Sequence, residues 1–420
     1  MIEFETESGN KYYYISINNH IYPGIAPKNL EMTNVEYVVS ESYLLKKIST
    51  FTIEVTQECN LRCRYCCYSG NYNDRRAHAS VELSDKDLIK CIEFIGNNMD
   101  LESPYITICF YGGEALLSQR KIKQIINLLQ TNHPNVEFVF SISSNGLLLN
   151  KHNIEWICNT PNLKIVITID GDKVMHDRNR ITQNGNGSFD IIMQNLYTFR
   201  KLYPDLYLQK VEFISTVKSI KDLIELNKFW MNNELLNKSV PKHISSLIPN
   251  FSKGESLAIA ETPFKYFFKA AFNSYINDEN NVLTNELRHF TNVIKHRTHT
   301  TIPSQQRFIT CLHEPYSCFI TAKGQLYICE RMCQEHCIGD LEHGIEQSKC
   351  VQLNKTFTKR KNKYCSKCWA KRLCRICATN LNNNEEQFIQ YCNSERMQLK
   401  LALQYFCEIL EFKKRRSEFF

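Results

Sequence analysis

The sequence has no apolar run long enough to cross a bilayer. Its first residues, Met1-Ile-Glu-Phe-Glu, lack the charged and then apolar pattern of a secretory signal. Internal repeats and low-complexity linkers are also absent. We therefore expect a cytoplasmic protein with no membrane partner. Its 420 residues, 43% hydrophobic and 23% charged, are sufficient for two or three globular domains.

The charge balance is modest, with a formal net charge of +7. Two basic runs stand out, at Lys359-Arg-Lys-Asn-Lys and Lys413-Lys-Arg-Arg. A solvated helix face and a polar tail account for them better than a nucleic-acid patch, so we expect no nucleic-acid partner. An alternative that the sequence leaves open is that these two basic runs attract an acidic peptide.

Cysteine is the one abundant residue that departs from ordinary composition. The chain has 19 cysteines, and eleven of them lie between Cys311 and Cys392. Disulfides are rare in the reducing cytoplasm, whereas metal sites there use thiolates. The cysteines therefore predict metal binding.

Strand-like and helix-like segments alternate from Phe51 onward. Ser84 and the acidic residues after it mark the start of the first helix. Such alternation favours a parallel sheet, and six units favour an α/β fold with a partial (β/α)6 TIM-like barrel over residues 51–248. The strand candidates are Phe51–Val55, Tyr105–Tyr111, Val136–Ile142, Leu163–Ile169, Leu208–Val217 and Lys242–Leu247, and the later helix candidates are Lys121–Gln130, Phe189–Lys201 and Ile220–Asn232.

Other regions flank the predicted barrel. Residues 1–50 alternate polar and apolar positions and read as a short N-terminal β segment, too small to be stable without packing on something. Residues 249–304 contain two bridging helices, residues 305–395 are cysteine-rich, and residues 396–420 form a C-terminal helix and basic tail. The helix candidates here are Phe264–Asn277, Thr284–Lys295 and Glu395–Phe412.

Cys59, Cys63 and Cys66 lie in one loop after the first strand candidate. Three thiolates can hold three irons of a cubane cluster and leave the fourth iron open for chemistry. The alternative is a zinc knuckle or three unrelated thiols, although zinc sites usually pair one C-x2-C with a second, distant pair. Cys67 follows directly, and we expect it to be a packed thiol because neighbouring side chains point in different directions.

Glycines and polar residues follow the next three strand candidates. They are Gly112-Gly-Glu, Ser144-Asn-Gly and Asp170-Gly. Functional groups of parallel barrels gather at the C-terminal ends of the strands, and glycine lets the backbone approach a ligand closely. The pattern predicts a ligand site at this end of the barrel, with an ordinary tight turn as the alternative at each position.

The C-x3-C-x2-C spacing of the first cysteine loop resembles the signature of the radical S-adenosylmethionine (radical SAM) enzymes. The resemblance implies that the open iron of a 4Fe–4S cluster binds S-adenosylmethionine, which one electron splits into methionine and a 5′-deoxyadenosyl radical. It also implies a set of contacts to that cofactor. These are Gly112, Gly113 and Glu114 with its amino group, Ser144 and Asn145 with its ribose, and Tyr65 near its adenine.

The stretch from Asp170 through His176 and Asp177 to Arg180 resembles one found in peptide-modifying members. A helix cap with a surface ion pair is the alternative.

The cysteines from Cys311 to Cys392 form what we term the second cysteine field. Their arrangement resembles the SPASM domain, which carries auxiliary clusters in peptide maturases. Its C-x2-C-x5-C spacing is too compact for a zinc ribbon, although two zinc sites remain the alternative. The interval between Cys374 and Cys377 is one residue shorter than usual in that family. Cys333, Cys337 and Cys350 exceed the pattern. The resemblance implies one 4Fe–4S cluster on Cys311, Cys318, Cys329 and Cys377, and another on Cys365, Cys368, Cys374 and Cys392.

Glu330 follows Cys329 at the position where sulfatase maturases carry an acidic base. A carboxylate beside a cluster and screened from water could accept a proton from a substrate radical. A surface carboxylate is the alternative.

These resemblances imply a radical SAM/SPASM oxidoreductase that modifies a ribosomally made precursor peptide. The expected product is a thioether or carbon–carbon crosslink, and the expected reductant is a flavodoxin or ferredoxin. The N-terminal β segment could bind a leader peptide by strand addition. The alternatives are an anaerobic sulfatase-maturing enzyme, which makes formylglycine, and a non-catalytic iron–sulfur or zinc protein.

Overall fold

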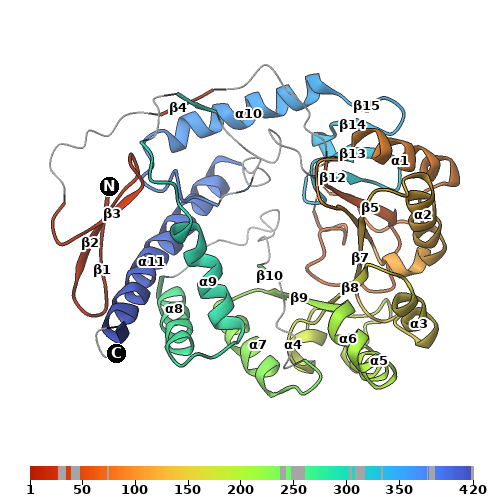
Figure 1. The fold of residues 1–420 in the computed structure, drawn as a ribbon, viewed down its shortest axis with the longest axis horizontal. Coiled ribbons are helices and arrows are strands. Elements are labelled where there is room, and N and C mark those ends of the chain that lie inside the picture. Colours follow the sequence, from red (N-terminus) through yellow and green to blue (C-terminus); the bar gives the residue numbers. More distant parts are fainter. Residues whose placement is uncertain are drawn as a thin grey trace.

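A single ten-stranded sheet organises most of the molecule. The computed structural model describes residues 1–26, 35–38, 48–72, 75–236, 243–246, 261–301, 305–307, 317–332, 334–375, 377 and 384–417. Six parallel strands follow one another in chain order, as a (β/α)6 unit requires, and the sheet stays open, which confirms the predicted partial barrel (Figure 1). They are β5 (Thr50–Thr56), β6 (Ile106–Gly112), β7 (Phe138–Ser144), β8 (Leu163–Thr168), β9 (Val211–Val217) and β10 (His243–Ser246).

The two faces of the barrel strands differ in polarity. Along β6, Ile106, Ile108 and Phe110 are buried, while Thr107, Cys109 and Tyr111 alternate with them and are half-buried. The buried face is stabilised by aromatic packing, as between Phe110 and Phe140, whose ring centroids lie 6.3 Å apart. The half-buried face lines the concave side of the barrel. The sequence alternation therefore separates a core face from a face that can receive ligands.

Helices connect the barrel strands. Ser84 caps the first of them as predicted, because its hydroxyl accepts a hydrogen bond from the Asp87 amide at 3.0 Å. One expectation was wrong: residues 208–210 are helical, since Pro204 begins a helix that ends where β9 starts. The helices are α1 (Asp85–Asn98), α2 (Gln119–Asn132), α3 (Lys151–Asn159), α4 (Lys173–Asp177), α5 (Phe189–Leu202), α6 (Pro204–Lys210) and α7 (Ile220–Asn232).

The cysteine-rich region begins inside the barrel sheet. Strand β12 (Ser317–Ile320) pairs in parallel with β5, and β13 (Gln325–Tyr327), β14 (Gly339–Asp340) and β15 (Gly344–Ile345) continue the sheet in antiparallel order. Helix α10 (Gln347–Cys365) follows. The strand that leads into the first cysteine loop is therefore hydrogen-bonded to the strand that begins the second cysteine field.

Three helices pack together on the other side of the molecule from the barrel (Figure 1). They are α8 (Glu261–Ile276), α9 (Val282–Lys295) and α11 (Glu385–Ser417). Rings of Phe268 and Tyr405 stack at 5.5 Å between α8 and α11. Helix α11 begins at Glu385, ten residues before the predicted start at Glu395. Among the residues described, no helix is both long and apolar enough to span a membrane.

The predicted N-terminal β segment is a three-stranded antiparallel sheet. It comprises β1 (Ile2–Glu5), β2 (Lys11–Ile15) and β3 (His20–Pro23). The Tyr12 hydroxyl donates to Glu411 of α11 at 2.8 Å, and the fully buried Tyr14 ring meets Trp369 edge-on. The sheet is thus held by the C-terminal helix and the cysteine-rich region. By contrast, β4 (Glu36–Val38) pairs with β11 (Gln305–Arg307).

Candidate active site

The first cysteine loop lies at the C-terminal end of β5. Cys59 is buried, and Cys63 and Cys66 are half-buried. The Arg62 and Arg64 amides donate to the carbonyls of Ile181 and Asn179, so the loop is fixed against the segment that follows β8. Burial is the main cause that raises the pKa of Cys59 to about 12, and the charges of Glu114, Cys63 and Cys66 act in the same direction. The three thiols are therefore mutual neighbours, and a bound cation would be needed to hold them as thiolates.

Two glycines bring the end of β6 against this loop. Gly112 has φ +153°, and a Cβ there would lie 2.2 Å from the Thr56 carbonyl oxygen. A Cβ on Gly113 would lie 2.1 Å from the Glu58 carbonyl oxygen, next to the amide of Cys59. The Gly113 amide donates to Thr56 and the Glu114 amide to Glu58, at 2.9 and 2.8 Å. Only glycine permits this approach, so these residues position the cysteine loop.

The Glu114 carboxylate ties β6 to the end of β7. It is fully buried and accepts hydrogen bonds from the Ser144 hydroxyl at 2.8 Å, the Asn145 amide at 2.7 Å and the Leu116 amide at 3.1 Å. Burial raises the pKa of Glu114, and these three donors oppose the shift. Both oxygens are satisfied within the protein, so the side chain acts by positioning strand ends.

Asn145 extends the same network to the cysteine loop. Its side-chain amide donates to the Asn60 side-chain oxygen at 2.7 Å and lies 3.9 Å from the Cys59 sulfur. Its own oxygen accepts from the Leu147 amide at 3.0 Å. The ends of β5, β6 and β7 are therefore joined by direct contacts, as the four strand-end motifs had indicated.

A buried triad of polar side chains joins the ends of β8 and β9. The Tyr65 hydroxyl donates to Asp170 at 2.5 Å and accepts from Arg180 at 2.8 Å. The other Asp170 oxygen accepts from the Thr216 amide at 2.8 Å. Burial opposes the charge of Arg180, but Tyr65, Cys63 and Asp170 together raise its pKa well above the ordinary value. A permanent cation thus lies beside the cysteine loop.

The Nε atom of Arg180 is buried and has no hydrogen-bond partner among the described residues. Buried donors are almost always paired in native proteins. An anionic group bound beside the cysteine loop would supply the missing acceptor, so this orphan donor fits a site built for a carboxylate-bearing ligand.

His176 and Asp177 support this arrangement from behind. The imidazole of His176 is fully buried. One ring nitrogen accepts from the Asp170 amide at 3.3 Å, and the other lies 3.1 Å from the Ser188 hydroxyl. The Ser188 hydroxyl in turn donates to the Arg180 carbonyl. Asp177 accepts from the Ser188 and Phe189 amides at the start of α5. Asp177 is therefore a helix cap, the alternative weighed above, and His176 is a positioning residue.

Glu54 is a site residue that the sequence reasoning missed. It lies on β5 with no exposed surface and accepts from Gln57 at 2.9 Å and from the Ala322 amide at 3.1 Å, and it pairs with Arg76. Ala322 belongs to the turn between β12 and β13. A lone carboxylate within the apolar run Phe51-Thr-Ile-Glu-Val was the available signal, because an acidic residue is rarely buried unless it is paired.

Glu330 and Cys67 lie near the barrel interior. Burial raises the pKa of Cys109 and Tyr111, two side chains of the concave face, and the Glu330 carboxylate adds to the shift at both. Its carbonyl accepts from the Tyr68 hydroxyl at 3.3 Å. The hydrogen bond with Cys66 lowers the pKa of Cys67, with burial opposing, and the Glu330 charge also acts on it. The base candidate therefore lies close to the cysteine loop.

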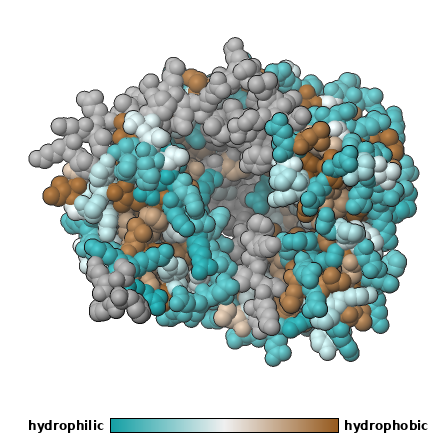
Figure 2. Space-filling model, viewed as in Figure 1, coloured by the Kyte–Doolittle hydropathy of each residue, from teal (hydrophilic) through white to brown (hydrophobic). Residues whose placement is uncertain are grey.

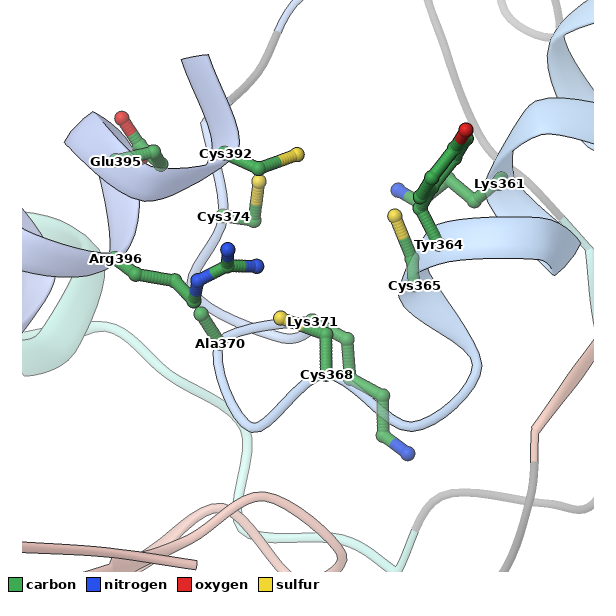
Figure 3. A pocket seen from close by; sticks show the side chains of 10 residues that line it. All are labelled: Lys361, Tyr364, Cys365, Cys368, Ala370, Lys371, Cys374, Cys392, Glu395 and Arg396. Carbon is green, nitrogen blue, oxygen red and sulfur yellow. The ribbon is translucent and has the colours of Figure 1, made fainter. Parts of the chain in front are cut away.

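Four cysteines of the second field surround one cavity (Figure 3). Cys365 ends α10, Cys368 and Cys374 lie on the following loop, and Cys392 projects from α11. Burial raises the pKa of both Cys365 and Cys392 to about 11. A donor set of four thiols around a cavity with Lys361, Lys371 and Arg396 fits an anionic iron–sulfur group.

The other predicted ligand set is only partly described. Cys311 and Cys333 lie outside the described residues. Cys318 is buried on β12, where Cys91 and Cys350 are the thiols whose charges act on it. Cys329 is half-buried and Cys377 exposed, and Cys337 donates to the Gly339 carbonyl. This assignment therefore stays a prediction.

Within the described ranges, no three His, Cys, Asp or Glu side chains are arranged to hold a single metal ion. A cubane binds each thiolate to a separate iron, so its ligands do not converge on one point.

Comparisons with known proteins agree with this geometry. Residues 53–219 match the family described as the Radical SAM superfamily. The chain is 27% identical over 212 residues to a cysteine-type anaerobic sulfatase-maturating enzyme of Clostridium novyi (strain NT), a match that spans 50% of this chain and 49% of that relative. It is 22% identical over 353 residues to the enzyme of the same description from Clostridium perfringens (strain 13 / Type A), over 80% of this chain and 91% of the relative.

The fold is also shared with solved structures. Native anSMEcpe with bound AdoMet superposes with a TM-score of 0.64 at 16% identity, covering 86% of this chain and 98% of that chain. Native anSMEcpe with bound AdoMet and Cp18Cys peptide gives 0.63 at the same identity, covering 86% and 98%.

We expect His176 to make stability depend on pH. Burial lowers the pKa of His176 to about 3, so the folded protein resists a proton that the unfolded chain binds near pH 6.5. The contribution of His176 to the free energy of unfolding should be fully present above about pH 6.5. As the pH drops below about 6.5, the free energy of unfolding should fall by about 1.4 kcal/mol per pH unit. Denaturant unfolding between pH 7.5 and 5.5 should show this slope, and His176→Gln should reduce it. The exposed His152, changed to Gln, is the control; an unchanged slope in His176→Gln would contradict the assignment.

Proposed function

Because residues 53–219 match the Radical SAM superfamily and the chain is similar to anaerobic sulfatase-maturating enzymes, we propose that it is a radical SAM enzyme that abstracts a hydrogen atom from a peptide substrate. The observation that carries the proposal is the direct connection of five successive strand ends, β5 to β9, around Cys59, Cys63 and Cys66. Binding groups of parallel barrels gather at this end of the sheet. Figure 2 shows the molecule hollowed near its centre, between the barrel and the α8–α9–α11 helices, with hydrophilic residues around the hollow.

Cys59, Cys63 and Cys66 would hold a 4Fe–4S cluster, and S-adenosylmethionine bound to it would supply the radical that abstracts hydrogen. The backbone of Gly112, Gly113 and Glu114 would face the amino group. The orphan Nε–H of Arg180 would donate a hydrogen bond to the carboxylate of that cofactor.

Ser144 and Tyr65 already have partners. The Ser144 hydroxyl donates to Glu114 and accepts from the Gly146 amide at 3.0 Å, which leaves one lone pair for a ribose hydroxyl. The Tyr65 hydroxyl is held by Asp170 and Arg180, so its ring would be the part near an adenine.

Cys365, Cys368, Cys374 and Cys392 would hold an auxiliary cluster in the cavity of Figure 3. Cys311, Cys318, Cys329 and Cys377 would hold a second one. Glu330, close to the cysteine loop and the concave face, would accept the proton that leaves when the substrate radical is oxidised, and an auxiliary cluster would take the one electron that is released.

The proposed product is a thioether or carbon–carbon crosslink in a precursor peptide. Formylglycine is the second candidate, because the relatives from Clostridium novyi and Clostridium perfringens are sulfatase-maturating enzymes. Mass spectrometry of the treated peptide separates the two. A crosslink removes two hydrogen atoms and keeps sulfur, whereas formylglycine from cysteine replaces sulfur with oxygen and yields an aldehyde.

The N-terminal sheet is the proposed leader-binding element. Strand β3 is at its edge, and no described strand pairs with its other side. The Gly24 amide donates to Lys11, so by alternation the Ile21 amide points away from β2, while Pro23 at the next outward position has no N–H. Strand addition at this edge would therefore depend on the Ile21 amide.

Changing Cys59, Cys63 and Cys66 together to Ala should remove about four of about twelve irons per chain and abolish 5′-deoxyadenosine release, because the cofactor loses its open iron. Iron and sulfide analysis of anaerobically purified protein and chromatography of dithionite-driven reactions measure this. Cys158→Ala, on α3, is the control. Retained turnover in the triple variant, or zinc as the only metal of the unmodified protein, would refute the proposal.

Glu330→Gln should lower peptide product formation by about 10²–10⁴-fold, since the amide cannot accept the proton. Release of 5′-deoxyadenosine should continue, because the residue acts after hydrogen abstraction. A cysteine-containing peptide and a leader-bearing precursor from a neighbouring reading frame are the substrates. Glu335→Gln, on the same segment, should behave as the unmodified enzyme. Equal loss of both products in Glu330→Gln would assign the residue to cofactor binding instead.

Ile21→Pro should weaken binding of a leader-bearing precursor at least about tenfold, because one outward hydrogen bond and the extended edge are lost. Calorimetry measures the affinity. The cysteine-containing peptide without a leader should be processed as before, which also shows that the variant is folded. Ile21→Val, which keeps the amide, is the control. Unchanged affinity for the precursor would exclude leader binding at this edge.

A further inference from the structure

Positive charge is segregated along one stretch of the cysteine-rich region. Between Gln347 and Asn384 the sequence has ten Lys and Arg residues and no Asp or Glu. Protein surfaces ordinarily mix the two signs. The stretch includes α10 and the loop that carries Cys368 and Cys374, so basic residues predominate around the cysteine-lined cavity, where the acidic lining residue Glu395 is paired with Arg375.

Four lysines of this stretch form what we term the lysine stripe: Lys355, Lys359, Lys363 and Lys367. Their spacing of four residues places the first three on one face of α10, and Lys367 continues the row into the loop. All four are exposed. Lys363 pairs with Glu385, and the other three form no ion pair with any residue that the structure describes.

The stripe has a cost for the helix. Like charges four residues apart destabilise a helix by about 0.2–0.5 kcal/mol per pair. Because Lys355, Lys359 and Lys367 have no anionic partner among the described residues, a binding partner that supplies anions would relieve this repulsion.

The stripe ends at the mouth of the cavity. Lys367 lies between two lining cysteines, Cys365 and Cys368, and Lys361 and Lys371 line the cavity itself (Figure 3). The lining cysteines are half-buried, so the group that they would hold lies just below the surface.

We propose that the lysine stripe docks an acidic one-electron carrier of the flavodoxin or ferredoxin class over the cavity of Cys365, Cys368, Cys374 and Cys392. This rests on the proposed function, because it assumes an iron–sulfur group in that cavity. One electron leaves the carrier, which is oxidised, and reduces the iron–sulfur group, with no proton transferred. Complementary charge would speed the encounter and set its orientation.

An electron carrier accounts for both observations, the charge and its position. A peptide substrate must reach the radical at the barrel, and a nucleic acid has no reason to be centred on a thiol-lined cavity. Only electron transfer requires a macromolecule to approach these cysteines without contacting the first loop.

The test measures binding of the iron-loaded enzyme to a bacterial flavodoxin and to a ferredoxin by biolayer interferometry. Lys355, Lys359 and Lys367 are changed to Glu together. At about 50 mM salt the affinity should fall at least about tenfold, and at about 300 mM the difference from the unmodified enzyme should shrink. The rate of electron transfer from the reduced carrier, followed by stopped-flow absorbance, should fall in parallel.

The matched control changes Lys86, Lys151 and Lys221, exposed residues at the starts of α1, α3 and α7, to Glu. It alters net charge equally and should bind nearly normally. Equal loss of carrier affinity in both variants would show that only the overall charge matters and would overturn the proposal. Full carrier binding by the stripe variant would also overturn it. So would tighter stripe-dependent binding of a polyglutamate peptide or duplex DNA than of either carrier.

Dithionite, a small reductant that needs no docking, separates this inference from the proposed function. The stripe variant should release 5′-deoxyadenosine with dithionite as the unmodified enzyme does. If even the unmodified enzyme releases none while carrier binding still depends on the stripe, the proposed function fails and the docking surface stands.

Discussion

The buried carboxylate of Glu114 fixes the ends of three barrel strands relative to one another. It accepts from the Ser144 hydroxyl and the Asn145 amide on one side, while the backbone around it is bonded to Thr56 and Glu58 on the other. A charge with no exposed surface is tolerated only when every lone pair has a donor. Because the cysteine loop begins at Glu58, the position of its first thiol depends on this network.

Two further buried charges extend the same constraint outward. Glu54 joins β5 to Arg76 and to the turn that precedes Cys329, and Asp170 joins Tyr65 to the end of β9. Each of these two carboxylates connects elements that are distant in the chain. Removing either carboxylate would leave buried hydrogen-bond donors without an acceptor. The concave end of the barrel is therefore built from polar contacts, whereas its convex face depends on apolar packing.

The two cysteine fields are physically continuous. Parallel pairing of β12 with β5 places the start of the second field beside the strand that carries the first. The lysine stripe runs along α10, and the cavity lies at the C-terminal end of that helix, at the far end of the same region. In the proposed function one end of this region would receive electrons and the other would perform the radical chemistry, and the basic run at Lys359 would then act in docking.

The sequence alone determined the order of strands and helices, the loop of three cysteines and the gathering of polar motifs at the strand ends. Those features depend on local periodicity and on the geometry of parallel sheets, which are written into short stretches of sequence. Only the tertiary structure decided that residues 208–210 are helical, that the side chains of Glu114 and Asp177 are hydrogen-bonded within the protein, and that the buried Glu54 joins β5 to Arg76 and to the turn between β12 and β13. Hydrogen bonds between different elements set the roles of these carboxylates, so a local signal such as the lone Glu54 in an apolar run could mark the residue but not name its partners.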